Sequence, residues 1–283
     1  MRVRFWGSRG TIASPGADTA RYGGNTSCVE VRLDDGSVLV LDAGTGARAL
    51  GHALIDEAPP RIDLFITHLH VDHVEGLGVF EPIWRPGTEL HLWGPPSPVA
   101  SVDARLAKYF SPPLFPVHLS EVPANVTFHD ATEGTWTVGA ATLRSAAIQH
   151  AGITVGYRIE ADGVSLTYLT DHEPALGMEL ETAEPEWISG AALAWEADLL
   201  IHDCQYTEEE YAARVGFGHS STAHVAAFAG KVGAQRLAMF HHDPMHSDDQ
   251  LDAMRELVLE GWNVEPDRVV IAAEGAELDP GAV

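Results

Sequence analysis

Four potential metal ligands occur within six residues, directly after an apolar segment at Ile62–Thr67. That segment is short, apolar and followed by polar residues, so it predicts a buried strand. Imidazole nitrogens and carboxylate oxygens are the ligands that zinc and similar divalent metals accept. Alternate residues of an extended chain point to the same side, and a following turn can direct its residues to a second point. We therefore expect a metal site rather than a polar loop, built from His68, His70, Asp72 and His73.

The composition excludes several other classes of protein. The chain has 283 residues, of which 45% are hydrophobic and 20% charged, as in a globular protein with a sizeable core. Its 17 Lys and Arg against 41 Asp and Glu give a net charge of −24, which disfavours broad binding to nucleic-acid backbones. The two cysteines, Cys28 and Cys204, are too few for a disulfide framework, so we expect both to be buried thiols in a reducing compartment. With no leader-like start and no apolar run of about 18 residues, we expect a cytoplasmic protein without membrane contact.

The pattern of apolar residues predicts sheets covered by helices. Apolar runs early in the chain follow one another closely, while later ones alternate with helical patterns. Predicted strands lie at 3–6, 28–33, 38–42, 62–67, 90–93, 142–148, 154–159, 165–169, 199–202, 237–240 and 269–272. Predicted helices lie at 47–57, 99–110, 207–215, 221–232 and 247–260. The proline-rich segment 94–123 is interpreted as a surface excursion, so we expect one domain over residues 1–283.

The spacing His68-x-His70-x-Asp72-His73 resembles the signature of the metallo-β-lactamase superfamily. The resemblance implies an α+β fold, a four-layer αββα sandwich with a one- or two-metal site at one edge of its sheets. It also extends along the chain, because histidine and aspartate recur after predicted strands in the order that the superfamily shows. These later matches are His150, Asp171 and His241.

The resemblance implies a ligand set for each of two divalent ions, expected to be Zn²⁺, with Mn²⁺ or iron as alternatives. One ion is expected on His68, His70 and His150, and the other on Asp72, His73 and His241. Asp171 and a hydroxide are expected to bridge the two ions. His242 competes with His241 for the last position, and the spacing from the preceding strand favours His241.

Within the superfamily, the C-terminal third resembles the branch of ribonuclease Z and cyclic phosphodiesterases. The segment Gly218–Ala223 matches that branch's Gly-His-Ser-Thr-like motif, in which a histidine paired with an acidic residue donates a proton. The resemblance therefore implies catalytic roles for His219 and Asp203, alongside Asp72. The branch often has glutamate where Asp203 stands, and the motif also suits the start of a helix, which is the structural alternative for His219.

We expect a binuclear metal-dependent phosphodiesterase that uses a metal-bridging hydroxide to attack a cyclic nucleotide or other small phosphodiester. One alternative is a thioesterase or lactonase of the same fold, and another is transfer-RNA 3′ processing, for which no basic arm is recognisable. A di-iron redox protein is disfavoured because such members typically carry glutamate at the position of His70. A non-catalytic scaffold is the least favoured reading. By analogy we also expect a homodimer without stable nucleic-acid binding.

Overall fold

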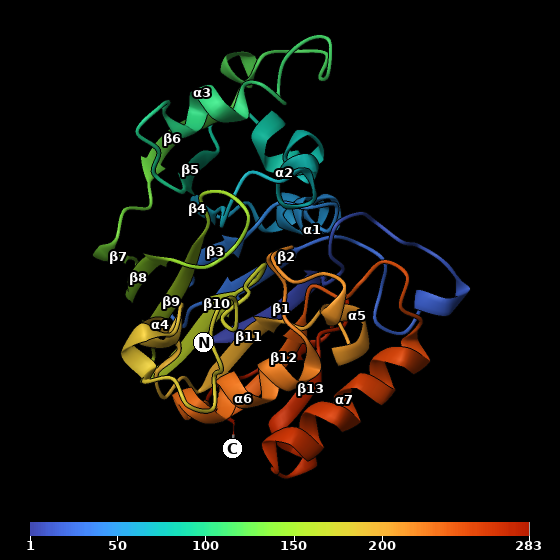
Figure 1. Cartoon of the computed structure of the whole chain (residues 1–283). Coiled ribbons are helices and arrows are strands. Elements are labelled where there is room, and N and C mark those ends of the chain that lie inside the picture. Colours follow the sequence, from blue (N-terminus) through green and yellow to red (C-terminus); the bar gives the residue numbers. More distant parts are fainter. Residues whose placement is uncertain (283) are drawn as a thin grey trace.

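Two seven-stranded sheets pack face to face, and helices cover the outer face of each sheet (Figure 1). The computed structural model describes residues 1–282. The first sheet is built from the N-terminal half of the chain together with a short C-terminal strand, and the second from the C-terminal half. This arrangement is the αββα sandwich that the sequence predicts, so the expected fold class is confirmed.

The first sheet has the strand order β14-β1-β2-β3-β4-β5-β6. Its antiparallel part joins β14, β1, β2 and β3, and its parallel part joins β3, β4, β5 and β6. The strands are β1 (Arg2–Gly7), β2 (Cys28–Arg32), β3 (Val38–Leu41), β4 (Arg61–Phe65), β5 (Glu89–Gly94), β6 (Asn125–Asp130) and β14 (Glu277–Leu278).

The second sheet repeats this plan, with the order β13-β12-β11-β10-β9-β8-β7. Here β13 to β10 are parallel, and β10 to β7 are antiparallel. The strands are β7 (Gly134–Val138), β8 (Ala141–Ala147), β9 (Val155–Ala161), β10 (Val164–Leu169), β11 (Leu199–Asp203), β12 (Arg236–Phe240) and β13 (Val269–Ile271).

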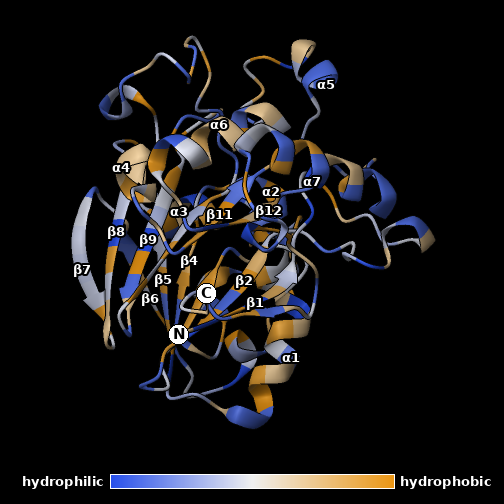
Figure 2. Cartoon of the chain, turned by 90° about the horizontal axis from the view of Figure 1, so that it is seen from below, coloured by the Kyte–Doolittle hydropathy of each residue, from blue (hydrophilic) through white to orange (hydrophobic). Residues whose placement is uncertain are grey.

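Three buried apolar layers hold the sandwich together. The central layer lies between the sheets and includes Phe5, Phe65 and Tyr157. The outer layer of the first sheet packs α1 (Ala47–Glu57), α2 (Val71–Val74) and α3 (Val102–Leu106) onto its strands. The outer layer of the second sheet does the same with α4 (Ala191–Ala194), α6 (Thr222–Val232) and α7 (Asp248–Trp262). Figure 2 shows hydrophobic residues concentrated in the strands, whereas α5 (Glu208–Ala212) at the periphery is largely hydrophilic.

Two of the predicted helices, α6 and α7, begin directly after a capping serine. Ser221 caps α6 by accepting from the His224 amide, and Ser247 caps α7 by accepting from the Gln250 amide. Each cap satisfies a backbone N–H that the first turn of a helix leaves without a partner. The loops before these helices are thereby fixed, and the loop before α6 contains His219.

Two groups of predictions at the edges of the fold were wrong or incomplete. The helix predicted at 99–110 is regular only over Val102–Leu106, after which the chain continues in turns. Pro112 and Pro113 follow, and a proline disfavours helical backbone in the residue before it. The strands β6, β7 and β14 were not predicted, because these three lie at or beside sheet edges and carry many exposed polar residues, which weakens the apolar signal.

Within residues 1–282, none of the helices has the length and apolar character that crossing a bilayer requires.

Candidate metal centre

The predicted ligands lie close together, in the segments that follow strands of both sheets. His68 follows β4 after two further residues, and the short helix α2 directs Asp72 and His73 inward. The second sheet contributes His150 after β8, Asp171 after β10 and His241 directly after β12. All seven predicted ligands belong to groups whose ligand atoms lie within 4.8 Å of one another.

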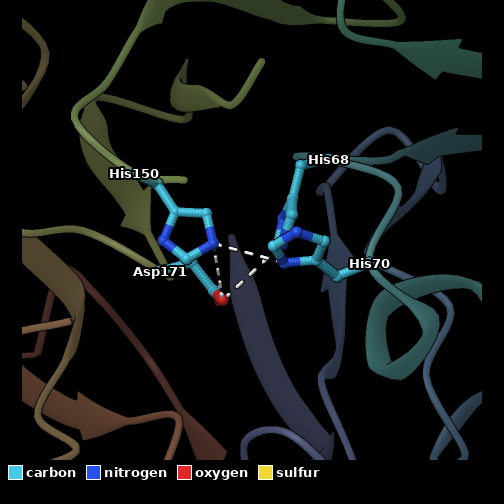
Figure 3. Close-up of side chains that lie close together, drawn as sticks. All are labelled: His68, His70, His150 and Asp171. Carbon is cyan, nitrogen blue, oxygen red and sulfur yellow. Dashed lines mark hydrogen bonds and ion pairs between the residues drawn. The ribbon is translucent and has the colours of Figure 1, made fainter. Parts of the chain in front are cut away.

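The first group surrounds one carboxylate oxygen of Asp171 (Figure 3). The Nε2 atoms of His68 and His150 lie 3.6 Å and 3.5 Å from Asp171 Oδ2. His150 Nε2 is also 3.3 Å from His70 Nδ1. In Figure 3 the rings of His68 and His70 approach from one side, and His150 and Asp171 approach from the other.

The second group surrounds the other oxygen of the same carboxylate. The Nε2 atoms of His73 and His241 lie 3.0 Å and 3.1 Å from Asp171 Oδ1. The Oδ2 atom of Asp72 is 3.4 Å from His73 Nε2 and 3.3 Å from His241 Nε2. Asp171 therefore offers one oxygen to each group, which is the geometry that a bridging ligand needs.

The residues fit a pair of divalent cations. The Nε2 atoms of His68 and His73 are buried and have no hydrogen-bond partner among the described residues, although a buried polar atom without a partner is costly. Their Nδ1 atoms are already used, by Thr67 Oγ1 and by Asp42 Oδ2 respectively. With a proton held on Nδ1, each Nε2 would offer its lone pair to a cation, as a metal-bound histidine requires.

Electrostatics lead to the same conclusion. Burial lowers the pKa of His73, but the surrounding carboxylates, with Asp171 the strongest, outweigh burial and raise that pKa well above its ordinary value. Burial raises the pKa of Asp171, yet His241 and His73 hold it well below its ordinary value. The pKa of each group is therefore set by the opposite charge of its neighbours. The buried carboxylates need positive charge close by, which divalent cations supply.

Asp42 hydrogen-bonds the nitrogen of His73 that faces away from the cluster. We call a residue that holds a predicted ligand in this way an outer partner. The Asp42 carboxylate accepts from His73 Nδ1 at 2.8 Å, from the Thr67 amide at 2.8 Å and from the Tyr168 hydroxyl at 3.0 Å. It is completely buried and contacts no other predicted ligand through these bonds. Asp42 thus fixes the ring of His73.

His219 and Asp203 form a second imidazole–carboxylate pair beside the cluster. His219 Nδ1 donates to Asp203 Oδ2 at 2.6 Å, while the Ser220 amide donates to Asp203 Oδ1. One His219 nitrogen lies within 4.8 Å of the ligand atoms of Asp171 and His241. Burial lowers the pKa of His219, but Asp203 more than compensates and raises it to about 9. The shorter carboxylate of Asp203 therefore does reach the histidine.

The structure places His241, and not His242, at the cluster. His242 Nε2 instead donates to the Ala272 carbonyl at 3.1 Å. The neighbouring histidines are also engaged elsewhere: His172 Nδ1 lies 2.9 Å from His202 Nε2, and His246 Nε2 lies 2.8 Å from Glu210. Both side chains are buried.

Three residues of the centre have left-handed backbone where their strands end. Asp42, Asp171 and His241 have φ angles of 58°, 52° and 56°. This region is unfavourable for residues other than glycine and is concentrated at functional sites, where surrounding contacts maintain it. The turn lets each side chain point from the end of a strand toward the space between the sheets.

Several contributing residues carry no signal that sequence reasoning could use. The Thr11 amide donates to Asp72 Oδ2 at 2.7 Å from a loop far away in the sequence. Gly10 lies so close to His241 that an added Cβ would be 2.4 Å from the imidazole ring. A backbone amide has no sequence signature, and a glycine in the Ser-Arg-Gly-Thr segment is explained equally well by a turn.

Comparison with known proteins identifies the family. The sequence profile of the β-lactamase superfamily domain matches residues 38–242. The ribonuclease Z of Haloarcula marismortui is 26% identical over 325 residues, which cover 98% of this chain and 96% of that protein.

Two solved structures share the fold. A diphosphatase of the PhnP family has a TM-score of 0.67 at 17% identity and covers 98% of this chain and 97% of its own. The short form of human tRNase Z has a TM-score of 0.65 at 19% identity, with both chains covered completely, at 100% each. At these identities the likeness shows the fold alone. The profile spans most of the chain, and all seven clustered ligands lie within the matched residues. The chain therefore belongs to the metallo-β-lactamase superfamily and is a metal-dependent hydrolase.

Proposed function

We propose that this chain is a binuclear phosphodiesterase that acts on a small phosphodiester, such as a cyclic nucleotide. One cation would be held by His68, His70 and His150, and the other by Asp72, His73 and His241, with Asp171 contributing to both. The orientation of the two Asp171 oxygens toward separate groups supports this assignment. Divalent cations so placed lower the pKa of water and neutralise charge on a phosphoryl group.

The observation that carries the proposal is the hydrogen bond of 2.6 Å between His219 Nδ1 and Asp203. Hydrolysis of a phosphodiester expels an alkoxide, which needs a proton as it leaves. Asp203 occupies Nδ1, so Nε2 is the nitrogen left to hold and transfer that proton. The His219 side chain is 11% exposed beside an otherwise buried cluster, so a substrate at the metals can reach it.

The surroundings of the centre favour a small substrate over a polyanion. Along the sequence, no Lys or Arg lies within four residues of any predicted ligand, of His219 or of Asp203. Arg214, five residues before His219, is stacked on the ring of Tyr206. Four large apolar side chains flank site residues instead, at 50% exposure or more; we call Ile12, Val71, Ile153 and Phe217 the apolar rim. RNA recognition relies on cationic side chains that neutralise many phosphates. An apolar rim suits the base or the organic group of a single phosphodiester.

Transfer-RNA processing is the second candidate, because the ribonuclease Z of Haloarcula marismortui aligns over nearly the whole chain. The human fold neighbour is likewise named for tRNA. This candidate predicts cleavage of a precursor tRNA with an affinity that falls steeply as salt rises. The acidic net charge of −24 and the apolar rim stand against it.

Turnover measured on matched substrates tests the proposal. Protein loaded with zinc or manganese is assayed on bis(p-nitrophenyl) phosphate, on cyclic nucleotides, on a precursor tRNA and on an aryl thioester. We expect turnover of the two small phosphodiester classes and little of the tRNA or thioester. A sample that holds two metals per chain but hydrolyses no small phosphodiester would contradict the proposal, and thioester turnover would favour the thioesterase alternative.

A second experiment separates proton donation by His219 from metal binding. His219→Gln is compared with His246→Gln, because His246 is also buried and paired with a carboxylate, Glu210, at 2.8 Å. We expect both variants to retain two metals and only His219→Gln to lose activity. Loss of a metal in His219→Gln would make this histidine a ligand instead.

A further inference from the structure

Glu173 is a completely buried carboxylate two residues beyond Asp171, and the roles given so far do not use it. Burying a carboxylate is costly unless hydrogen bonds compensate. Here Oε1 accepts from the Gly216 amide and from the Tyr211 hydroxyl, each at 2.8 Å. Oε2 accepts from the Gly218 amide at 2.7 Å. Hydrogen bonds from N–H groups to an ionised carboxylate are about twice as strong as neutral ones.

These bonds hold the loop that leads from α5 to His219. Gly216 and Gly218 have φ angles of 86° and 91°, which a glycine adopts readily and other residues rarely do. The carboxylate thus fixes two glycines in a segment that would otherwise have wide conformational freedom. The same residue also reaches the loop before His150, because its amide donates to the Gln149 carbonyl at 2.9 Å.

The fixed loop in turn orients His150. The Gly218 carbonyl accepts from His150 Nδ1 at 2.8 Å, so its position sets the rotation of the ring. A Cβ on Gly218 would lie 2.1 Å from that Nδ1, which shows how closely the loop packs on the ring. The opposite nitrogen, His150 Nε2, is the atom that faces Asp171 and His70.

We propose that Glu173 is a positioning residue that sets His150 for one of the two cations and His219 for the substrate. The inference rests on the proposed ligand role of His150. The structural link runs from the carboxylate to the Gly218 amide, through the carbonyl of the same residue, to the imidazole. Because Gly218 directly precedes His219, the same contact also sets the position of the proton donor.

Glu173→Gln tests this link with little change in volume. An amide has only one oxygen, so the –NH₂ group must face either the Gly218 amide or the Gly216 amide, and one of these donors loses its acceptor. Removing the direct hydrogen-bond partner of a ligand typically weakens metal binding about 10–100-fold, and Glu173 acts on His150 through Gly218, so the expected loss lies at the lower end of that range. We expect this loss for one of two zinc ions in a competition titration, with the other ion unaffected. Tyr211→Phe is the matched control, because it removes a bond to the same carboxylate but leaves both backbone donors paired, and we expect wild-type affinity for both ions.

Two further measurements separate positioning from general stability. Amide exchange at residues 216 and 218 should accelerate in Glu173→Gln, while the unfolding midpoint with both metals saturating changes little. Wild-type zinc affinities in Glu173→Gln would overturn the proposal, as would equal weakening of both sites together with a lowered midpoint. Metal binding is measured without substrate. A wild-type protein that binds two zinc ions but hydrolyses no phosphodiester would therefore refute the proposed function and leave this test intact.

Discussion

Each half of the sandwich contains a buried aspartate that accepts from Nδ1 of a histidine, yet the two pairs are placed for different chemistry. In the first half, Asp42 and His73 are 2.8 Å apart and both side chains are completely buried. In the second half, Asp203 and His219 are 2.6 Å apart, and the histidine side chain is partly exposed. The hydrogen bond is the same in both pairs, and the surroundings of the other ring nitrogen differ.

The difference teaches that the partner of the second nitrogen decides what such a pair does. His73 Nε2 faces carboxylate oxygens of Asp171 and Asp72 at 3.0 Å and 3.4 Å, so it suits a cation between them. His219 is positioned at the edge of the cluster, where a substrate can reach it. One pair is therefore expected to hold a metal, and the other to transfer a proton.

The largest effect is expected from Asp171→Ala, because both groups depend on this carboxylate. Removing it takes away the oxygen that faces His68 and His150 and the one that faces His73 and His241. We expect loss of both ions and of all activity, measured by elemental analysis after dialysis and by turnover. Retention of one ion per chain would show that one of the two groups holds its ion without Asp171.

Asp42→Asn should weaken metal binding without abolishing it. The amide keeps the volume of the side chain but cannot accept from His73 Nδ1 and all three other donors together. We expect about a 10–100-fold loss of zinc affinity, as for other outer partners of metal-bound histidines. Asp203→Asn is the paired variant and should reduce zinc affinity much less, because Asp203 Oδ2 lies 3.7 Å from Nδ1 of the predicted ligand His241 and forms no hydrogen bond with it. Equal losses in the two variants would remove the distinction between the pairs.

His219→Gln should leave the metals in place and lower turnover according to the leaving group. A positioned proton donor contributes about 10²–10⁴-fold to rate. We expect a loss in this range for an alkyl leaving group and a smaller one for p-nitrophenolate, which leaves readily without a proton. The readout is kcat/KM for both substrates, and equal losses would indicate a structural role for His219.

Ser221→Ala should have the smallest effect, on stability alone. It removes the cap of α6, the helix that begins three residues after His219. We expect the free energy of unfolding to fall by about 1 kcal/mol, measured by denaturant titration, with zinc affinity and turnover unchanged. A marked loss of activity would mean that the cap helps to position His219.

The N-terminal half of the centre was largely predictable, because its ligands are consecutive in the sequence. His68, His70 and His73 follow one buried strand, and local spacing suffices to bring them together. The ligands of the C-terminal half stand singly after three different strands. Each was weak evidence alone, and only a family resemblance connected them. In the structure these residues do lie in the expected groups, and their roles as ligands stay a prediction until metal binding is measured.

The outer partners could not be predicted from local pattern. Asp42 is the last residue of a predicted strand and lies outside the ligand motifs, and Glu173 sits between a histidine and a proline without a recognisable motif. Their functions depend on hydrogen bonds to segments 31 and 45 residues away.

Segment 94–123, which was interpreted as a surface excursion, packs partly into the outer layer of the first sheet, through Val102, Leu106 and Phe110. The expected homodimer stays a prediction.

The sequence by itself determined the type of chemistry, because histidines and carboxylates clustered after apolar strands have few uses other than holding divalent metals. The spacing of its apolar residues also indicated sheets covered by helices, and the resemblance to the metallo-β-lactamase superfamily implied the four-layer arrangement. Only the tertiary structure decided which nitrogen of each histidine is free, which of His241 and His242 faces the cluster, and how Asp171 divides its oxygens. These choices depend on side-chain orientation at the ends of strands, where left-handed backbone turns and distant hydrogen bonds act together. The periodicity of apolar residues along the chain contains no information about these turns or these hydrogen bonds.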